Sequence, residues 1–237
     1  MIKIAIGIGT NTNILKAIEI FKKDHEVELI LIDNDDDLAN SVLDDNIDAV
    51  VRGSLAASGV IKKVKKDFPE ISRATYVNGA GHEFLLSPVG IDEGNTIEEK
   101  LRIAENCGEF LRKLGKEPKI AILADGRKGD YGRSQQISQS IDDSEKLTRL
   151  IKENTDFEVK NYYILIEHAI NEKCNVIIAP DGIIGNIIFR TLVLVNSWPS
   201  YGAVTFAIKG IYIDTSRDQS VEGYLRSLIF AYNLAKL

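Results

Sequence analysis

The stretch Asn175-Val-Ile-Ile-Ala-Pro180-Asp181-Gly182-Ile-Ile-Gly185-Asn186 has the pattern of a buried strand that leads into a helix. An apolar run closed by Pro, Asp and Gly is typical of a strand in a parallel sheet, which is buried on both faces. We expect the strand over 175–179 and the helix from Asn186, with Asn186 as its capping residue. Backbone N–H groups between Gly182 and Gly185 would then form a nest that suits a phosphoryl or carbonyl oxygen. On these residues alone, an ordinary capped helix is an equally good interpretation.

The same succession of strand, loop and helix continues on both sides of this stretch. Strands are expected over 3–8, 26–32, 47–52, 73–77, 83–87, 119–124 and 203–209, and helices over 14–23, 55–66, 96–114, 142–152, 162–173 and 221–236. Strands that alternate with helices predict an α/β fold, with a mostly parallel sheet and helices on both faces. Ligands bind such sheets beyond the carboxyl ends of the strands. The loops expected at that edge span 7–13, 53–58, 125–130, 180–186 and 214–220.

A second polar loop, Asp214-Thr-Ser216-Arg217-Asp-Gln-Ser220, precedes the last expected helix. A Ser beside an Arg pairs a hydroxyl with a guanidinium fork, which suits a phosphate or a developing oxyanion. The plainer interpretation is that Ser220 caps the helix and Arg217 makes a surface ion pair.

The segment Gly7-Ile-Gly9-Thr-Asn-Thr12 resembles the start of a dinucleotide-binding loop, with Asp33 at the end of the next strand. The third glycine of that pattern is replaced by Thr12, so a plain strand-to-helix turn is the favoured interpretation. Anion binding at this helix start stays open. A nicotinamide-dependent dehydrogenase is accordingly a distant hypothesis.

Composition narrows the choice of compartment and partner. The net charge is -6, which argues against a nucleic-acid surface, and the only two cysteines predict no disulfide framework. We expect no metal site, because the acidic run 33–37 lacks the glycine and the closing glutamate of a calcium loop. Without a signal peptide or an apolar stretch long enough to cross a bilayer, the chain is expected to be cytoplasmic and free of the membrane.

Four segments in order resemble the phosphate acetyl- and butyryltransferases. They are 175–181 with Gly185-Asn186-Ile187, Lys209-Gly210 through Asp214-Thr-Ser216-Arg217, Gly53-Ser-Leu-Ala-Ala-Ser58 with the basic helix after it, and 104–129 with Lys128-Gly129. Together they extend over roughly residues 47 to 230. The compact length resembles a particular archaeal branch of that superfamily, the methyltransferase-associated subunit X or fourth methanogenesis marker group.

The resemblance implies an architecture and a set of partners. It implies two lobes with a cleft, as in isocitrate and isopropylmalate dehydrogenases, one lobe formed by 1–75 plus 205–237 and the other by 76–204. It also implies a homodimer and, through the archaeal branch, an association with methyltransferase subunits.

The activity implied by the resemblance is transfer of an acyl group between phosphate and the thiol of coenzyme A, which is a substrate and not a tightly bound cofactor. Ser216, Arg217 and Glu222 are the catalytic candidates. The candidates for binding acyl phosphate or phosphate are Gly53, Ser54, Ser58, Lys62, Lys63, Lys128, Gly129, Asp181, Gly185 and Asn186.

Three departures from the family pattern leave a second hypothesis open. Asp218 follows Ser-Arg where the family has glycine, and Gly223 stands at the position of the catalytic aspartate. Glu222 is one residue short, which turns a helical side chain by about 100°. Lys62 or Lys63 replaces an arginine and loses the bidentate fork. The alternative is a catalytically altered subunit, or a ligand-binding partner, in archaeal methyl-group transfer.

Overall fold

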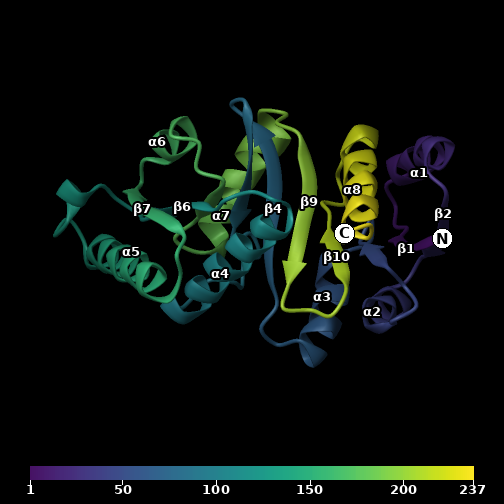
Figure 1. The fold of residues 1–237 in the computed structure, drawn as a ribbon, viewed down its shortest axis with the longest axis horizontal. Helices are drawn as coiled ribbons and strands as arrows, with labels where there is room; N and C mark the ends of the chain where they lie inside the picture. The colour runs from purple at the N-terminus through teal and green to yellow at the C-terminus, as the bar shows by residue number, and fades with distance from the viewer. The chain divides into compact units, whose positions relative to one another are not determined.

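The computed structural model describes residues 1–237 apart from the side chains of Ala57 and Ser58, so the expected role of Ser58 lies outside the described residues. The chain divides into two compact units. Unit 1 combines residues 1–73 with 200–237, and unit 2 contains residues 74–199. Figure 1 traces the chain from the N-terminal segment of unit 1 through unit 2 and back.

Unit 1 is built on a mostly parallel sheet. Its elements are β1 (Ile2–Gly7), α1 (Asn13–Asp24), β2 (Val27–Ile32), α2 (Asp35–Leu43), β3 (Ala49–Val51), α3 (Ala57–Asp67), β9 (Ser200–Phe206), β10 (Ile211–Asp214) and α8 (Val221–Leu234). The strand order is β2-β1-β3-β10-β9, in which only β9 runs antiparallel to its neighbour β10. Four carboxyl ends, those of β1, β2, β3 and β10, therefore lie at one edge.

Helices cover both faces of the unit 1 sheet. Leu38 of α2 and Val60 of α3 pack with Val50 and Tyr212 of the strands in one buried cluster. On the other face, α1 and α8 lie side by side (Figure 1), and the rings of Phe21 and Tyr232 meet edge to face at 5.8 Å. β-branched strand residues suit such a doubly covered sheet, because they pack well on a pleated surface.

Unit 2 also has strands that are mostly parallel to their neighbours. Its elements are β4 (Ser72–Gly79, whose first two residues count with unit 1), β5 (His82–Ser87), α4 (Ile97–Lys113), β6 (Lys119–Leu123), the short 3₁₀-helix η1 (Lys128–Asp130), α5 (Gln135–Asn154), β7 (Glu158–Tyr163), α6 (Ile166–Asn171), β8 (Val176–Ile178), α7 (Gly182–Phe189) and the π-helical turn η2 (Arg190–Val195). The order is β4-β5-β8-β6-β7, with β4 antiparallel to β5 and the others parallel. The predicted fold class, a mostly parallel sheet with helices, is confirmed in each unit.

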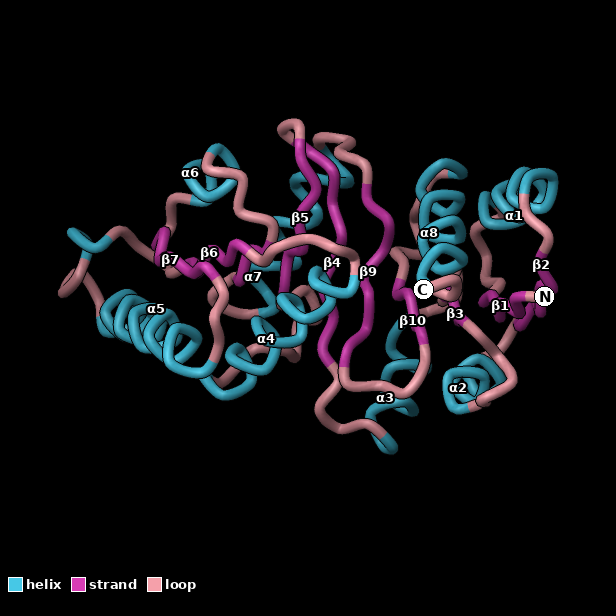
Figure 2. Tube along the Cα trace, in the orientation of Figure 1, coloured by secondary structure: helices cyan, strands magenta, loops and turns pink.

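Two strands escaped the sequence analysis, and several expected helices are wrong in extent; the helix expected over 142–152, for example, is α5 and begins at Gln135. Residues 158–163 form β7, so the helix expected over 162–173 shrinks to α6. No strand is predicted for residues 211–213, which form β10 together with Asp214. Figure 2 draws β7 beside β6, next to α5. The sequence of β7 misleads because Glu158 and Lys160 are exposed, which leaves few apolar positions from which to recognise a strand.

Every helix in the described part of the chain is too short or too polar to cross a lipid bilayer.

Candidate functional site

Three loops meet at the carboxyl edge of the unit 1 sheet, and we call them the rim loops: 8–12 after β1, 52–56 after β3 and 215–220 after β10. The amide of Gly9 donates to the Ser54 hydroxyl at 2.8 Å, which ties the first loop to the second. The Thr215 hydroxyl donates to the Gly53 carbonyl at 2.7 Å, which ties the third loop to the second. The parallel order of the strands brings these loops together, as expected for a ligand-binding edge.

The main chain of Arg217 is held from two directions. The side-chain amide of Asn11 donates to the carbonyls of Arg217 (2.9 Å) and Gln219 (3.1 Å), and the Tyr224 hydroxyl donates to the Arg217 carbonyl at 2.9 Å. The Arg217 side chain is exposed and makes no hydrogen bond or ion pair with any described residue. The surface ion pair considered for Arg217 is therefore absent from the described part of the chain. Its guanidinium is available to an anion.

Ser216 directly precedes Arg217 in the third rim loop. It is partly buried, and its hydroxyl accepts only a long hydrogen bond, 3.4 Å, from the Asp218 amide. At that distance the bond is weak, so the hydroxyl can still donate to a ligand.

Glycines at the rim allow backbone segments to touch. Gly53 has a φ of +61°, and a Cβ added there would lie 2.0 Å from the Gly7 carbonyl oxygen. A Cβ on Gly9 would lie 2.2 Å from the Ser54 carbonyl oxygen. Close contact between the two loops thus explains why these positions are glycine, and no bound dinucleotide is needed to explain them. This agrees with the favoured interpretation of a plain turn.

A buried charge cluster, which the sequence analysis missed, lies directly before the third rim loop. Asp214 accepts from Arg73 at 2.8 Å and from the Nε of Arg52, while Arg52 also donates to the Leu55 carbonyl. Burial alone would raise the pKa of the Asp214 carboxyl, but the two guanidiniums outweigh it and lower that pKa. The cluster joins the end of β10 to the loop after β3. In the sequence, the cluster is indicated only by the position of Arg52, Arg73 and Asp214 next to apolar strand segments.

Glu222 occupies the first turn of α8, and Ser220 caps that helix by accepting from the Gly223 amide at 3.1 Å. The cap agrees with the sequence. Glu222 is exposed, and its pKa is lowered, first by its own backbone N–H and then by the Ser220 hydroxyl. A carboxylate of lowered pKa is a weaker proton acceptor at neutral pH.

The two lysines of α3 differ in availability. Lys63 forms an ion pair with Asp36 of α2, whereas Lys62 is exposed. Lys62 is therefore the freer of the two cations.

The structure corrects the helix start in unit 2. Helix α7 begins at Gly182, and Asp181 is its cap, accepting from the Ile184 amide at 2.8 Å. Asn186 lies inside the helix, where its side-chain amide donates to the Val89 carbonyl at 2.9 Å. Gly185 is also helical, and a Cβ there would lie 1.8 Å from the Pro88 carbonyl oxygen. The prediction that Asn186 caps the helix is wrong. Asp181 directly precedes the first helical residue, so its side chain can accept a hydrogen bond from an unpaired amide of the first turn.

The remaining candidates, Lys128 and Gly129, lie in η1 of unit 2, where both are exposed. The Lys128 ammonium is 3.8 Å from a carboxylate oxygen of Glu145 on α5. The described residues contain no group of three or more His, Cys, Asp and Glu side chains placed to hold a metal ion.

Comparison with known proteins gives archaeal relatives over most of the chain. An uncharacterized methyltransferase of Methanocaldococcus jannaschii is 40% identical over 242 residues, and the match covers 97% of each chain. A protein of Methanosarcina barkeri with the provisional name methyltransferase mtx subunit X is 39% identical over 203 residues, which cover 84% of this chain and 74% of that protein. The chain belongs to the archaeal methyltransferase subunit X family. No family model matches the sequence.

This member of the subunit X family has the fold of the phosphotransacylases. A branched-chain phosphotransacylase from Enterococcus faecalis V583 superposes with a TM-score of 0.73 at 19% identity, over 99% of both chains. A phosphotransacetylase from Streptococcus pyogenes gives 0.71 at 16% identity, over 99% of this chain and 94% of the other. An isocitrate dehydrogenase from Methylococcus capsulatus gives 0.59 at 11% identity, over 99% and 85%. The archaeal branch stated from sequence is confirmed by these relatives, and the resemblance to the phosphate acyltransferases is confirmed as a shared fold.

Within the subunit X chain, the structure brings together only some of the predicted site residues. Gly53, Ser54, Ser216 and Arg217 share the rim of unit 1, with Glu222 on the helix that follows. The sequence analysis missed Asn11, and no local pattern indicates its role, because the Arg217 carbonyl that it binds is 206 positions away.

Proposed function

We propose that this protein handles a phosphorylated acyl compound at the rim loops, and transfers the acyl group between phosphate and the thiol of coenzyme A or a related thiol. The observation that carries the proposal is the Arg217 guanidinium, which has no protein partner among the described residues while its own main chain is fastened to the loop after β1. Holding the backbone reduces the entropy lost when the side chain orders around an anion.

Charge and hydrogen bonding at the rim suit a phosphoryl group. Arginine offers two parallel donors to phosphate oxygens, and the Ser216 hydroxyl offers a further donor beside it. Lys62 is exposed on α3, which follows the second rim loop.

The proposed step is a displacement at the acyl carbon. The thiol loses its proton to a base, and the thiolate forms a C–S bond while the C–O bond to phosphate breaks. The phosphate leaves with the bonding electron pair, and Arg217 stabilises its charge. Glu222 is the candidate base in this chain, and its lowered pKa predicts slow chemistry.

A second candidate function is a ligand-binding subunit in archaeal methyl-group transfer. The relatives carry the provisional name methyltransferase mtx subunit X, and Gly223 stands where the acyltransferases have their catalytic aspartate. This alternative retains the anion site and dispenses with the base.

The deciding experiment compares wild type, Arg217→Ala and Arg149→Ala in forming acyl-CoA from acetyl, propionyl and butyryl phosphate. Arg149 is an exposed arginine of α5 that makes no hydrogen bond or ion pair with a described residue, so its replacement removes the same charge from a helix of unit 2. We expect thioester formation in wild type and Arg149→Ala, and at least a hundredfold loss in Arg217→Ala, the effect of removing about 2.7 kcal/mol of transition-state stabilisation.

Thermal stability separates the two candidates. A ligand at 100 times its Kd stabilises the fold by about 2.7 kcal/mol. Stabilisation by phosphate or coenzyme A that Arg217→Ala removes, without turnover, supports the binding subunit. If neither turnover nor stabilisation depends on Arg217, both proposals for the rim are wrong. NAD should leave the melting temperature unchanged.

A further inference from the structure

Unit 2 contains a cavity of about 450 Å³ at the carboxyl ends of three parallel strands. Leu123 ends β6 and is followed by Ala124 and Asp125, Ile164 follows β7, and Pro180 with Asp181 follows β8. The position is the one at which α/β sheets bind ligands, and the volume lies within the usual range for small-molecule sites.

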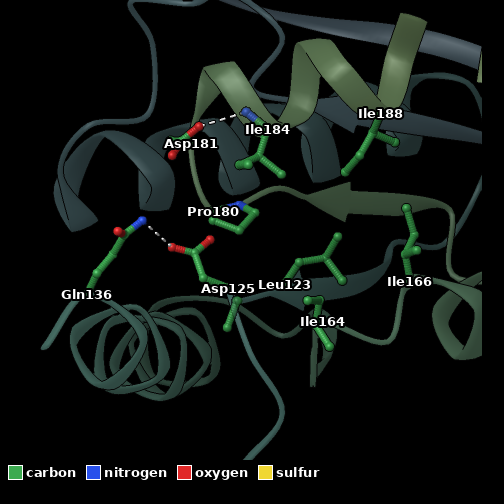
Figure 3. A pocket seen from close by; sticks show the side chains of 10 residues that line it. Leu123, Asp125, Gln136, Ile164, Ile166, Pro180, Asp181, Ile184 and Ile188 are labelled. Atoms are coloured by element: carbon green, nitrogen blue, oxygen red, sulfur yellow. Dashed lines mark hydrogen bonds between the residues drawn. The ribbon is translucent and has the colours of Figure 1, made fainter. Parts of the chain in front are cut away.

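The walls of this cavity differ in chemistry. Figure 3 places Ile164, Ile166 and Ile188 on one side and Asp125, Asp181 and Gln136 on the other. Ile164 is 48% exposed and Ile184 36% exposed. Covering such aliphatic surface with an apolar ligand is favourable, at about 25 cal/mol per Å².

The two carboxylates have spare acceptor capacity. Asp181 accepts a hydrogen bond from the Ile184 amide through one oxygen, and no described residue bonds to the other. Asp125 accepts a long bond, 3.4 Å, from Gln136. Neither carboxylate forms an ion pair with a described residue, although an ionised carboxylate can accept about four hydrogen bonds.

The nearby cation does not neutralise the acidic wall. The buried ammonium of Lys100 donates to the Pro180 carbonyl at 3.0 Å, and it feels the carboxylates of Asp143, Asp181 and Asp125. Burial lowers the pKa of Lys100, which those carboxylates oppose. Asp125 and Asp181 line the cavity and Lys100 does not, so the lining carries a negative charge that favours a cation over a phosphate.

We propose that the cavity is a second ligand site, which binds a small organic cation: a protonated amine attached to an aliphatic chain. The ammonium would lie between Asp125 and Asp181, and the chain would lie against the isoleucines. The two carboxylates have the wrong sign of charge for an acyl phosphate, so this ligand is not the substrate of the proposed acyl transfer and the proposal does not rest on it.

The test uses hexylamine as the probe, with hexanoate and hexanol as matched ligands of the same chain length. Isoleucine methyl groups labelled with ¹³C report binding by NMR at pH 7. We expect hexylamine to shift the methyl signals of Ile164, Ile184 and Ile188 in a saturable manner, and hexanoate at the same concentrations to leave them unshifted. Equal binding of hexanol or hexanoate would overturn the proposal, since the acidic wall would then contribute nothing.

Variants test the carboxylates directly. Asp125→Asn/Asp181→Asn removes both charges and keeps the shape, and asparagine caps a helix as well as aspartate does. We expect hexylamine affinity to fall at least tenfold in this variant, and to be unchanged in Glu153→Gln, which removes an exposed charge of α5 outside the cavity. Unchanged affinity in the double variant, or equal loss in Glu153→Gln, would refute the site.

Discussion

At the scale of single residues, Asp214 joins the core of unit 1 to its rim. It is 9% exposed, yet it keeps its charge, because Arg52 and Arg73 surround its carboxylate. Arg52 is buried as well, and Asp214 holds the pKa of its guanidinium high against the effect of burial. The energetic role of such a cluster appears when one charge is removed, since the others then stay buried without compensation.

Asp214→Asn is expected to destabilise the fold by about 3–5 kcal/mol at pH 7, because two buried guanidiniums lose their counter-charge. Urea unfolding measures this change as a lower midpoint at an unchanged slope. The matched control is Asp156→Asn, which removes a mostly exposed partner of Arg112 and should change the midpoint little. Similar midpoints for the two variants would contradict the assigned role of Asp214.

The same carboxylate predicts a pH dependence. The folded-state pKa of Asp214 is lowered, so its stabilisation is complete above the unfolded value of about 3.9 and is lost as the pH falls through the folded value. Asp214→Asn should therefore lose less stability than wild type between pH 5 and pH 2. Parallel stability curves for the two proteins in this range would refute the assignment.

At the scale of elements, the loops that leave β1 and β3 are joined by close backbone contacts and by the Ser54 hydroxyl. Gly53 is essential to these contacts for two reasons. Its φ is positive, and a Cβ at this position would collide with the carbonyl oxygen of Gly7. A side chain there must move the loop after β3, and with it the Ser54 hydroxyl that holds Gly9.

Gly53→Ala is expected to destabilise the fold by about 1–3 kcal/mol from the backbone conformation, with a further cost from the collision. Two controls separate these causes. Gly115 has a φ of +73° and nothing within 4 Å of an added Cβ, so Gly115→Ala reports the conformation alone. Gly129 has open space and no positive φ, so Gly129→Ala should be nearly neutral. In thermal unfolding, Gly53→Ala should have the lowest melting temperature of the three variants. Equal melting temperatures for the Gly53 and Gly115 variants would show that the collision does not contribute to the destabilisation.

Elements with strong local signals could be predicted, and those without them could not. Helix α4 follows Thr96, which accepts from the Glu99 amide, and α8 follows Ser220, as their sequences indicate. Strand β10 has only four residues, and β7 carries charged residues on its exposed side. Their strand conformation depends on pairing with β3 and β6, which are distant in sequence.

At the scale of the whole molecule, unit 1 is assembled from both ends of the chain. Helix α8 supplies Tyr232, whose ring lies 5.8 Å from Phe21 and 4.8 Å from His25 of the segment that ends α1. The N-terminal strands therefore need the C-terminal helix to complete their core.

Tyr232→Ala is expected to weaken both chain ends together, by about 3–5 kcal/mol if the cavity does not collapse. Hydrogen exchange should then show lower protection in α1 as well as in α8, with protection in β6 and β8 retained. Ile183→Ala, which truncates an exposed residue of α7, serves as the control and should leave α1 unaffected. Loss of protection confined to α8 would contradict a shared core.

The sequence by itself determined the fold class, the archaeal family and the loop that precedes the last helix. Apolar periodicity, glycines and caps act over a few residues, so they are visible along the chain. Only the tertiary structure decided which loops meet. Asn11 and Arg217 are separated by 206 positions, and Arg52 and Asp214 by 162. The physical reason is that hydrogen bonds and buried charge pairs need no periodicity, only proximity, and strand order creates that proximity.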